Sequence, residues 1–147
     1  MRKQVFTAIT MLGLLLTLAG ASVHAQSRTK IEATIPFDFT AGETNLKAGV
    51  YSVKFISHNA LLLRSADGKK SAIIVAPRAI GGETKKPERM VFHRYGDRYF
   101  LSQVWMLRTD SGRELDPSKA ERALAKGLLV AKGNAKPVTV QVAAVPR

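Results

Sequence analysis

The residues whose types and spacing suggest chemistry are basic side chains that lie close together in the second half of the chain. Two tyrosines accompany five cations, and the group is Lys85, Lys86, Arg89, Arg94 and Arg98 with Tyr95 and Tyr99. Ammonium and guanidinium groups bind phosphate and carboxylate groups, and arginine also stacks on planar rings. We therefore take the five cations as the candidate binding site for an anionic partner.

This basic cluster has two interpretations at the level of sequence. In a hairpin, Arg94 and Arg98 would point to opposite faces of the sheet, so they need not form one site. Basic side chains also keep secreted proteins soluble and protect edge strands from pairing with other chains. The cluster is therefore either a binding surface or a solubilising one.

No segment carries a recognisable catalytic, cofactor or metal-binding motif. A Gly-x-Ser-x-Gly elbow is missing, and the Gly-Lys-Lys-Ser stretch lacks the upstream glycine and the following helix of a phosphate-binding loop. His58 and His93 fit a turn and a strand. Asp110, Glu114 and Asp116 lack the ligand order of a calcium loop. We therefore expect a non-catalytic protein without a cofactor or a metal.

Two other classes of function stay open. The first is a small hydrolase or isomerase that uses a barrel cavity lined by His93, Tyr95 and Tyr99. A concave pocket with converging polar groups would indicate this enzyme, whereas a flat or grooved basic face would indicate a binding module. The second is an assembly subunit, whose exposed apolar edge would be completed by another chain.

Length and composition set the broad class of the protein. The chain has 147 residues, of which 46% are hydrophobic, and it contains no cysteine. This length favours a single domain, and the apolar fraction excludes wholesale disorder. The absence of cysteine excludes a disulfide scaffold, a cysteine-ligated zinc site and a thiol nucleophile. The 23 basic residues outnumber the 11 acidic ones, which gives a formal net charge of +12.

Residues 1–25 have the three parts of a secretory signal peptide. Arg2 and Lys3 precede a short apolar stretch, and small residues lead to a cleavage site after Ala25. We therefore expect an exported protein, periplasmic or extracellular, with no transmembrane segment after cleavage. Its anionic partners would be anionic polysaccharide, lipopolysaccharide or another envelope polymer, and no intracellular nucleic acid is expected.

The mature chain reads as β structure. Residues 31–40 alternate between apolar and polar side chains, with Pro36 favouring an edge position. A second strand follows at 49–55. The Asp67-Gly68 pair predicts a hairpin in which Leu63 faces Ala72, Leu61 faces Ile74, and Leu62 faces Ile73 on the other side. Because both faces are apolar, this hairpin is expected in the centre of the fold.

A second hairpin is predicted about Gly96-Asp97. An unbroken alternation sets Phe92 opposite Leu101 and Met90 opposite Gln103. The expected core row contains these residues and continues through Trp105 and Leu107. The opposite face, which includes Val104, would meet the helix or solvent.

One helix is predicted, with Asp116-Pro117 or Ser118 at its start and Gly127 as its stop. Residues 26–127 then form a β-domain with a C-terminal helix, and 128–147 form a tail or a last edge strand after Pro137. The expected fold is mainly β: an antiparallel β-sandwich or partly closed barrel of about six or seven strands with one short C-terminal α-helix.

Several short motifs lie between residues 35 and 126. They are Pro36-Phe37-Asp38-Phe39 with Gly42, Leu46 with Ala48-Gly49 and Tyr51, and the stretches LLRS at 62–65, RYGDRYFL at 94–101, REL at 113–115 and AER at 120–122. In this combination the chain resembles a family of small, exported, uncharacterised bacterial β-proteins. Lys47 departs from the proline that relatives carry before the Ala-Gly pair, which affects only the stiffness of that turn. The resemblance implies export and a β fold, and it implies no activity, substrate or binding residue.

Overall fold

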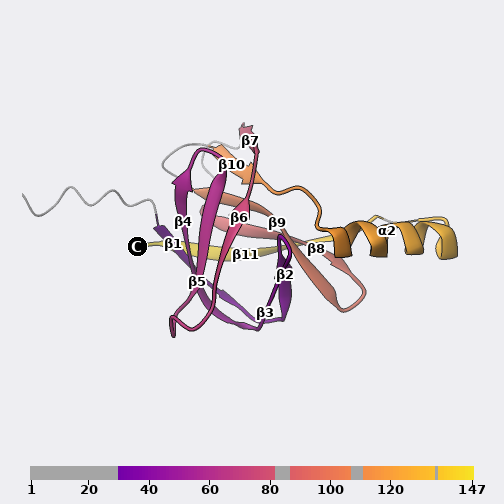
Figure 1. The fold of residues 1–147 in the computed structure, drawn as a ribbon, viewed down its shortest axis with the longest axis horizontal. Coiled ribbons are helices and arrows are strands. Elements are labelled where there is room, and N and C mark those ends of the chain that lie inside the picture. The colour runs from indigo at the N-terminus through magenta and orange to yellow at the C-terminus, as the bar shows by residue number, and fades with distance from the viewer. Residues whose placement is uncertain (1–29, 82–86, 107–110, 135) are drawn as a thin grey trace, which may run out of the picture.

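A computed structural model describes residues 30–147, with the exception of 82–86, 107–110 and 135 (Figure 1). The predicted signal peptide lies outside this range. The described part contains strands β1 (Lys30–Ile35), β2 (Phe39–Ala41), β3 (Thr44–Leu46), β4 (Gly49–Ser57), β5 (Ala60–Ser65), β6 (Ser71–Val75), β7 (Arg78–Gly81), β8 (Arg89–Tyr95), β9 (Arg98–Met106), β10 (Ser111–Glu114) and β11 (Val138–Pro146), with helix α2 (Lys119–Lys132) before the last strand.

The strands form one nearly closed, barrel-like sheet in the order β3-β2-β9-β8-β11-β1-β4-β5-β6. The free side of β9 is shared, because β2 pairs with its beginning and β10 pairs with its end. The fold is therefore mainly β, as predicted, but its eleven strands exceed the expected six or seven. The sheet is also mixed, since β2 runs parallel to β9. The additional strands have three or four residues each, which is too short for an alternating pattern to be recognised.

The C-terminal segment differs from the prediction. Helix α2 continues through Gly127 and ends at Gly133, whose φ of 66° lets its N–H donate to the carbonyl of Leu129. One internal glycine costs a helix only about 1 kcal/mol, so the helix-forming residues after Gly127 prevail. β11 then pairs with β8 on one side and β1 on the other, so it is an interior strand and not an edge strand.

The inner face of the sheet forms the hydrophobic core. Alternate residues of β1 are buried, as the sequence predicts, but the strand ends at Ile35 and pairs with β11 and β4, so the edge position predicted from Pro36 is wrong. An aromatic group fills one side of the core, where the Phe92 ring makes T-shaped contacts with Phe37 and Phe39 at centroid distances of 5.2 and 5.5 Å. A single sheet that curves on itself buries one face only, so the outer face of each strand is available to solvent or to a second element.

The β5–β6 hairpin has the predicted register, with Leu61 opposite Ile74 and Leu62 opposite Ile73. Its predicted central position is wrong. β6 ends the strand order, and on its outer face Ile73 is 69% exposed and Val75 62% exposed. The second apolar face therefore has no covering layer in the described part of the chain.

The β8–β9 hairpin begins in the predicted register, with Phe92 opposite Leu101. The pairing then shifts, so Met90 lies opposite Val104 and not opposite Gln103. The shift is a β-bulge, in which one strand has an extra residue and its later side chains change face.

The bulge places Ser102 as the extra residue of β9 and corrects the predicted core row. Val104 is fully buried in the core, whereas Trp105 packs on the outer face and is not part of the core cluster. Leu107 lies outside the described residues. A bulge leaves no clear mark in an alternating sequence, so the strict period of two assigned Trp105 to the wrong face.

We expect Val104→Ala to lower the free energy of unfolding by about 2 kcal/mol, because it removes two methyl groups from the filled core. Val75→Ala removes the same groups from an exposed side chain and should change that free energy by less than about 0.5 kcal/mol. Urea denaturation followed by circular dichroism measures both values. Equal losses in the two variants would contradict the face that the bulge assigns to Val104.

Candidate functional site

The structure does not bring the five predicted cations together. Lys85 and Lys86 lie outside the described residues. Arg89 is buried: its guanidinium carbon lies 4.5 Å from the centre of the Trp105 ring, and its Nη1 donates to a backbone carbonyl. The buried Arg89 supports the outer face of the sheet, and it is not part of an exposed patch.

Arg94 and Arg98 are exposed on opposite faces of the hairpin, as predicted. Arg94 pairs across the strands with Tyr99, while Arg98 pairs with Tyr95 and lies over the ring of Phe100 at 5.4 Å. The two guanidinium groups therefore serve different surfaces. Arg98 shares its surface with helix α2, because the neighbouring Tyr95 contacts the first turn of that helix.

A buried carboxylate attaches α2 to the sheet. Glu121 Oε1 lies 2.8 Å from Nδ1 of His93 on β8 and accepts a hydrogen bond from the Tyr95 hydroxyl at 3.4 Å. The other ring nitrogen of His93 lies 3.1 Å from Oγ of Ser102, the residue added by the bulge. The two ring nitrogens of His93 thus have one polar partner each, Glu121 on the helix and Ser102 on β9. A buried charge needs such partners, so this cluster holds the helix in one place.

The local sequence also fixes where α2 begins. Ser118 is the N-cap, and its hydroxyl oxygen accepts the backbone N–H of Glu121 at 3.1 Å. Glu43 accepts the backbone N–H of Lys119 at 3.0 Å. The first turn of α2 is therefore both capped and attached to the sheet.

Burial and the negative charge of Glu121 together raise the pKa of Tyr95 above its usual value.

Beyond this turn, α2 projects away from the barrel (Figure 1). Glu121 is its only buried residue. The exposed charges of the helix are all positive, and they belong to Lys119, Arg122, Lys126 and Lys132. We call these four residues, together with Arg98, the basic helix surface.

The basic helix surface was missed at the sequence level, although the sequence contains a signal for it. After Glu121 the chain has no further acidic residue, whereas it has five basic ones: Arg122, Lys126, Lys132, Lys136 and Arg147. The sequence left open whether the mixed face of the second hairpin meets the helix or solvent, so it did not show which charges of the helix are exposed. The projection of α2 leaves them in solvent.

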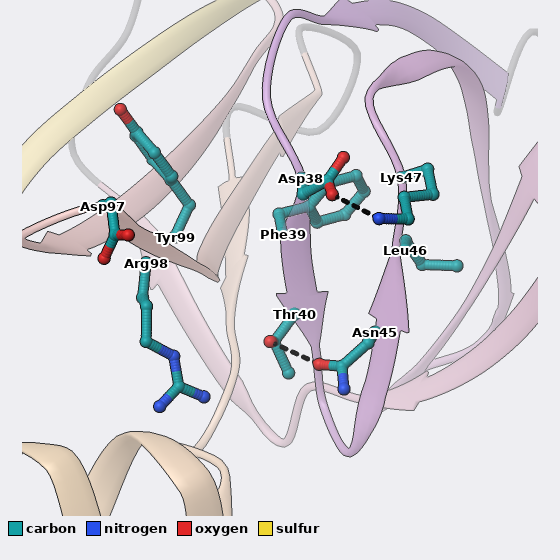
Figure 2. A pocket seen from close by; sticks show the side chains of 9 residues that line it. All are labelled: Asp38, Phe39, Thr40, Asn45, Leu46, Lys47, Asp97, Arg98 and Tyr99. Atoms are coloured by element: carbon teal, nitrogen blue, oxygen red, sulfur yellow. Dashed lines mark hydrogen bonds and ion pairs between the residues drawn. The ribbon is translucent and has the colours of Figure 1, made fainter.

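A groove of about 320 Å³ lies beside Arg98, between the β2–β3 hairpin and the turn of β8–β9 (Figure 2). Its lining contains both signs of charge. Asp38 forms an ion pair with Lys47 at 2.7 Å and accepts the N–H of Ala48 at 2.9 Å. These contacts lower the pKa of Asp38, and the same pairing raises the pKa of Lys47. In the view, Arg98 points away from this pair and toward the helix. The groove thus has a mixed polar and apolar lining, and Lys47, one of its two cations, is already paired with Asp38.

A second groove, of about 360 Å³, crosses the outer face of β11, β8 and β9. It is lined by Ile80, Gly81, Arg89, Val91, His93, Gln103, Trp105, Thr139 and Gln141. Trp105 donates its indole N–H to the side-chain oxygen of Gln103 at 3.0 Å, and this hydrogen bond holds the indole ring in the wall of the groove. His93 is the titratable group shared by this groove and the buried cluster, but its ring nitrogens already face Glu121 and Ser102.

The order Ser102, His93, Glu121 matches that of a nucleophile, a base and an orienting carboxylate. Ser102, however, is only 4% exposed and is not among the residues that line either groove. The cavity lining expected for an enzyme is also divided, because Tyr99 stacks on Phe37 at the core side, away from His93. In this structure the hydrogen bonds between Ser102, His93 and Glu121 hold helix α2 on the sheet.

The described residues contain no group of three or more side chains able to hold a metal ion. They also contain no helix that is both long and apolar enough to span a membrane.

Comparison of the chain with protein-family models, curated proteins and solved structures found no match. The resemblance to small exported bacterial β-proteins therefore stays a prediction.

We expect Glu121→Gln to lower the pKa of Tyr95, because the substitution removes a negative charge that opposes formation of the phenolate. The pKa should stay above the usual value of about 10, since burial is the larger cause of its elevation. Ultraviolet titration, with Tyr95→Phe to assign the transition, measures the shift. An unchanged Tyr95 titration would contradict the contact.

The sign of the linked effect on stability follows from the raised pKa of Tyr95. The folded state holds the phenolic proton more tightly than the unfolded state does, so this contribution is present below about pH 10 and is lost as the pH rises through the folded-state value. The loss should be smaller in Tyr95→Phe than in the parent protein. Denaturation at a series of alkaline pH values compares the two.

Glu121→Ala should reduce the free energy of unfolding by about 2 kcal/mol, because His93 and the Tyr95 hydroxyl lose their buried partner. Hydrogen exchange of the α2 amides should accelerate in the same variant. The exposed Lys126→Ala is the control, with a change of less than about 0.5 kcal/mol. If α2 keeps its protection in Glu121→Ala, the carboxylate is not what holds the helix.

Proposed function

We propose that the protein is an exported, non-catalytic binding protein that attaches to anionic envelope polymers, such as anionic polysaccharide or lipopolysaccharide, through the basic helix surface. The observation that supports this proposal is the projection of α2, whose exposed charges are all cationic. Such a surface attracts polyanions over distances comparable to the Debye length, about 10 Å at 0.1 M salt.

The shape of the surface suits an extended partner. A helix of 14 residues is about 21 Å long, and cations at 119, 122 and 126 recur every three or four residues along one side. A polymer with repeated anionic groups can contact several of these side chains at once. No single contact needs to be strong, because the exposed charges act together.

Retention on an immobilised anionic polysaccharide, measured across a salt series, tests this proposal. The quadruple variant Lys119→Gln, Arg122→Gln, Lys126→Gln and Lys132→Gln should elute at much lower salt than the parent protein, because each cation contributes to the salt-dependent attraction. The matched control is Lys54→Gln, Arg64→Gln, Lys69→Gln and Lys70→Gln, which removes the same charge from exposed positions on other elements.

The two quadruple variants separate a local site from a general charge effect. The control should stay close to the parent protein. An equal loss of retention in both variants would show that only the net charge matters, and salt-independent retention would contradict an anionic partner.

A small hydrolase is the second candidate, and the Ser102–His93–Glu121 order is the specific observation that favours it. A serine-directed fluorophosphonate would label Ser102 if this hydroxyl were an accessible nucleophile. We expect no labelling, because Ser102 is buried and lines neither groove of the described structure. Labelling that disappears in Ser102→Ala would instead establish the hydrolase.

A further inference from the structure

The free end of α2 exposes large apolar side chains among its cations. Leu129 is 56% exposed and Val130 is 81% exposed, which is the highest value among the exposed large hydrophobic residues of the described structure. Both residues lie beyond the turn that Glu121 docks on the sheet. Their exposure is therefore a property of the projecting part of the helix.

Helical spacing places these side chains on the basic side of α2. Leu129 and Val130 follow Lys126 by three and four residues, and Lys126 follows Arg122 by four, so the four side chains share one side of the helix. The opposite side carries Glu121, which faces the barrel. The outward side thus carries cations over the first half of the helix, at 119, 122 and 126, and apolar side chains near its end.

This end of the helix is well formed. Gly133 closes it in the left-handed conformation, and its N–H donates to the carbonyl of Leu129 at 3.0 Å. After Lys136 the chain returns to the barrel as β11. The capped end can therefore contact a flat surface without unfolding.

We propose that the tip of α2 binds the surface of an anionic lipid bilayer, with Leu129 and Val130 in the interfacial layer and the neighbouring cations on the lipid phosphates. A polysaccharide chain offers charge but no hydrocarbon for the two apolar side chains. A lipid surface offers both, because its anionic phosphates can bind the cations of the helix and its hydrocarbon can take up the apolar side chains at the tip. Long basic side chains can lie along the apolar layer while their charged ends reach the headgroups.

Two isolated aliphatic side chains are also too small a patch for a stable protein interface, which buries far more surface on each partner. This inference rests on the proposed function, because it names lipid phosphates as the anionic groups that the basic helix surface contacts. It adds a requirement that a soluble polyanion does not have, namely the two apolar side chains.

Cosedimentation of the purified protein with vesicles tests the inference. One set contains phosphatidylcholine with one quarter phosphatidylglycerol, and the other contains phosphatidylcholine alone. The parent protein should bind the anionic vesicles and not the neutral ones. Leu129→Ser with Val130→Ser should weaken vesicle binding by about tenfold or more, while retention on immobilised anionic polysaccharide stays unchanged.

The matched control is Ile73→Ser with Val75→Ser, which removes two exposed aliphatic side chains from β6 and should leave vesicle binding unchanged. Circular dichroism confirms that each variant is folded. Retention on the polysaccharide without vesicle binding would overturn this inference and leave the proposed function intact. Loss of both would overturn both. Vesicle binding that is indifferent to Leu129→Ser and Val130→Ser, or equally weakened by the β6 pair, would also overturn the inference.

Discussion

The insertion of β11 between β8 and β1 is the constraint on which the rest of the structure depends. This strand joins the beginning of the domain to its second hairpin by backbone hydrogen bonds on both sides. β10 lies on the far side of β9, so the chain between β10 and β11 has to cross both strands of the hairpin. Since the inner face is filled by the core, the crossing takes place on the outer face. Helix α2 is part of that crossing.

The buried carboxylate of Glu121 determines how the crossing is oriented. An ionised group removed from water requires hydrogen-bond donors, and His93 and Tyr95 supply them on the outer face of β8. Once the only acidic side chain of α2 is turned toward the sheet, the remaining charges of the helix face solvent with a single sign. A structural requirement for stability therefore also creates the charged surface on which the functional proposal is based.

Much of the candidate site could have been anticipated from the sequence, but its location could not. The predicted cations at 94 and 98 are exposed on opposite faces, as the period of two requires, and that rule holds for any regular hairpin. Arg89 was an equally reasonable choice, yet the outer face of β9 buries it against Trp105. The bulge at Ser102 placed Trp105 there, and the alternating sequence carries no mark of it. The cations of α2 were visible in the sequence, but their exposure depends on how far the helix extends from the barrel.

The sequence by itself determined the features that depend on neighbouring residues: the alternation of β1, the two tight hairpins with the register next to their turns, and the excess of basic residues. These features follow from backbone preferences and side-chain contacts within a few positions. The sequence left the start of the helix open between Asp116-Pro117 and Ser118, and the structure places the N-cap at Ser118. The tertiary structure alone decided the position of β11, the short strands that complete the sheet, the face occupied by Val104, and the projection of α2. The position of β11 depends on pairing between segments far apart in the chain, the face of Val104 depends on a bulge that leaves no mark in the alternating pattern, and the direction of α2 depends on the contacts of Glu121 with the sheet.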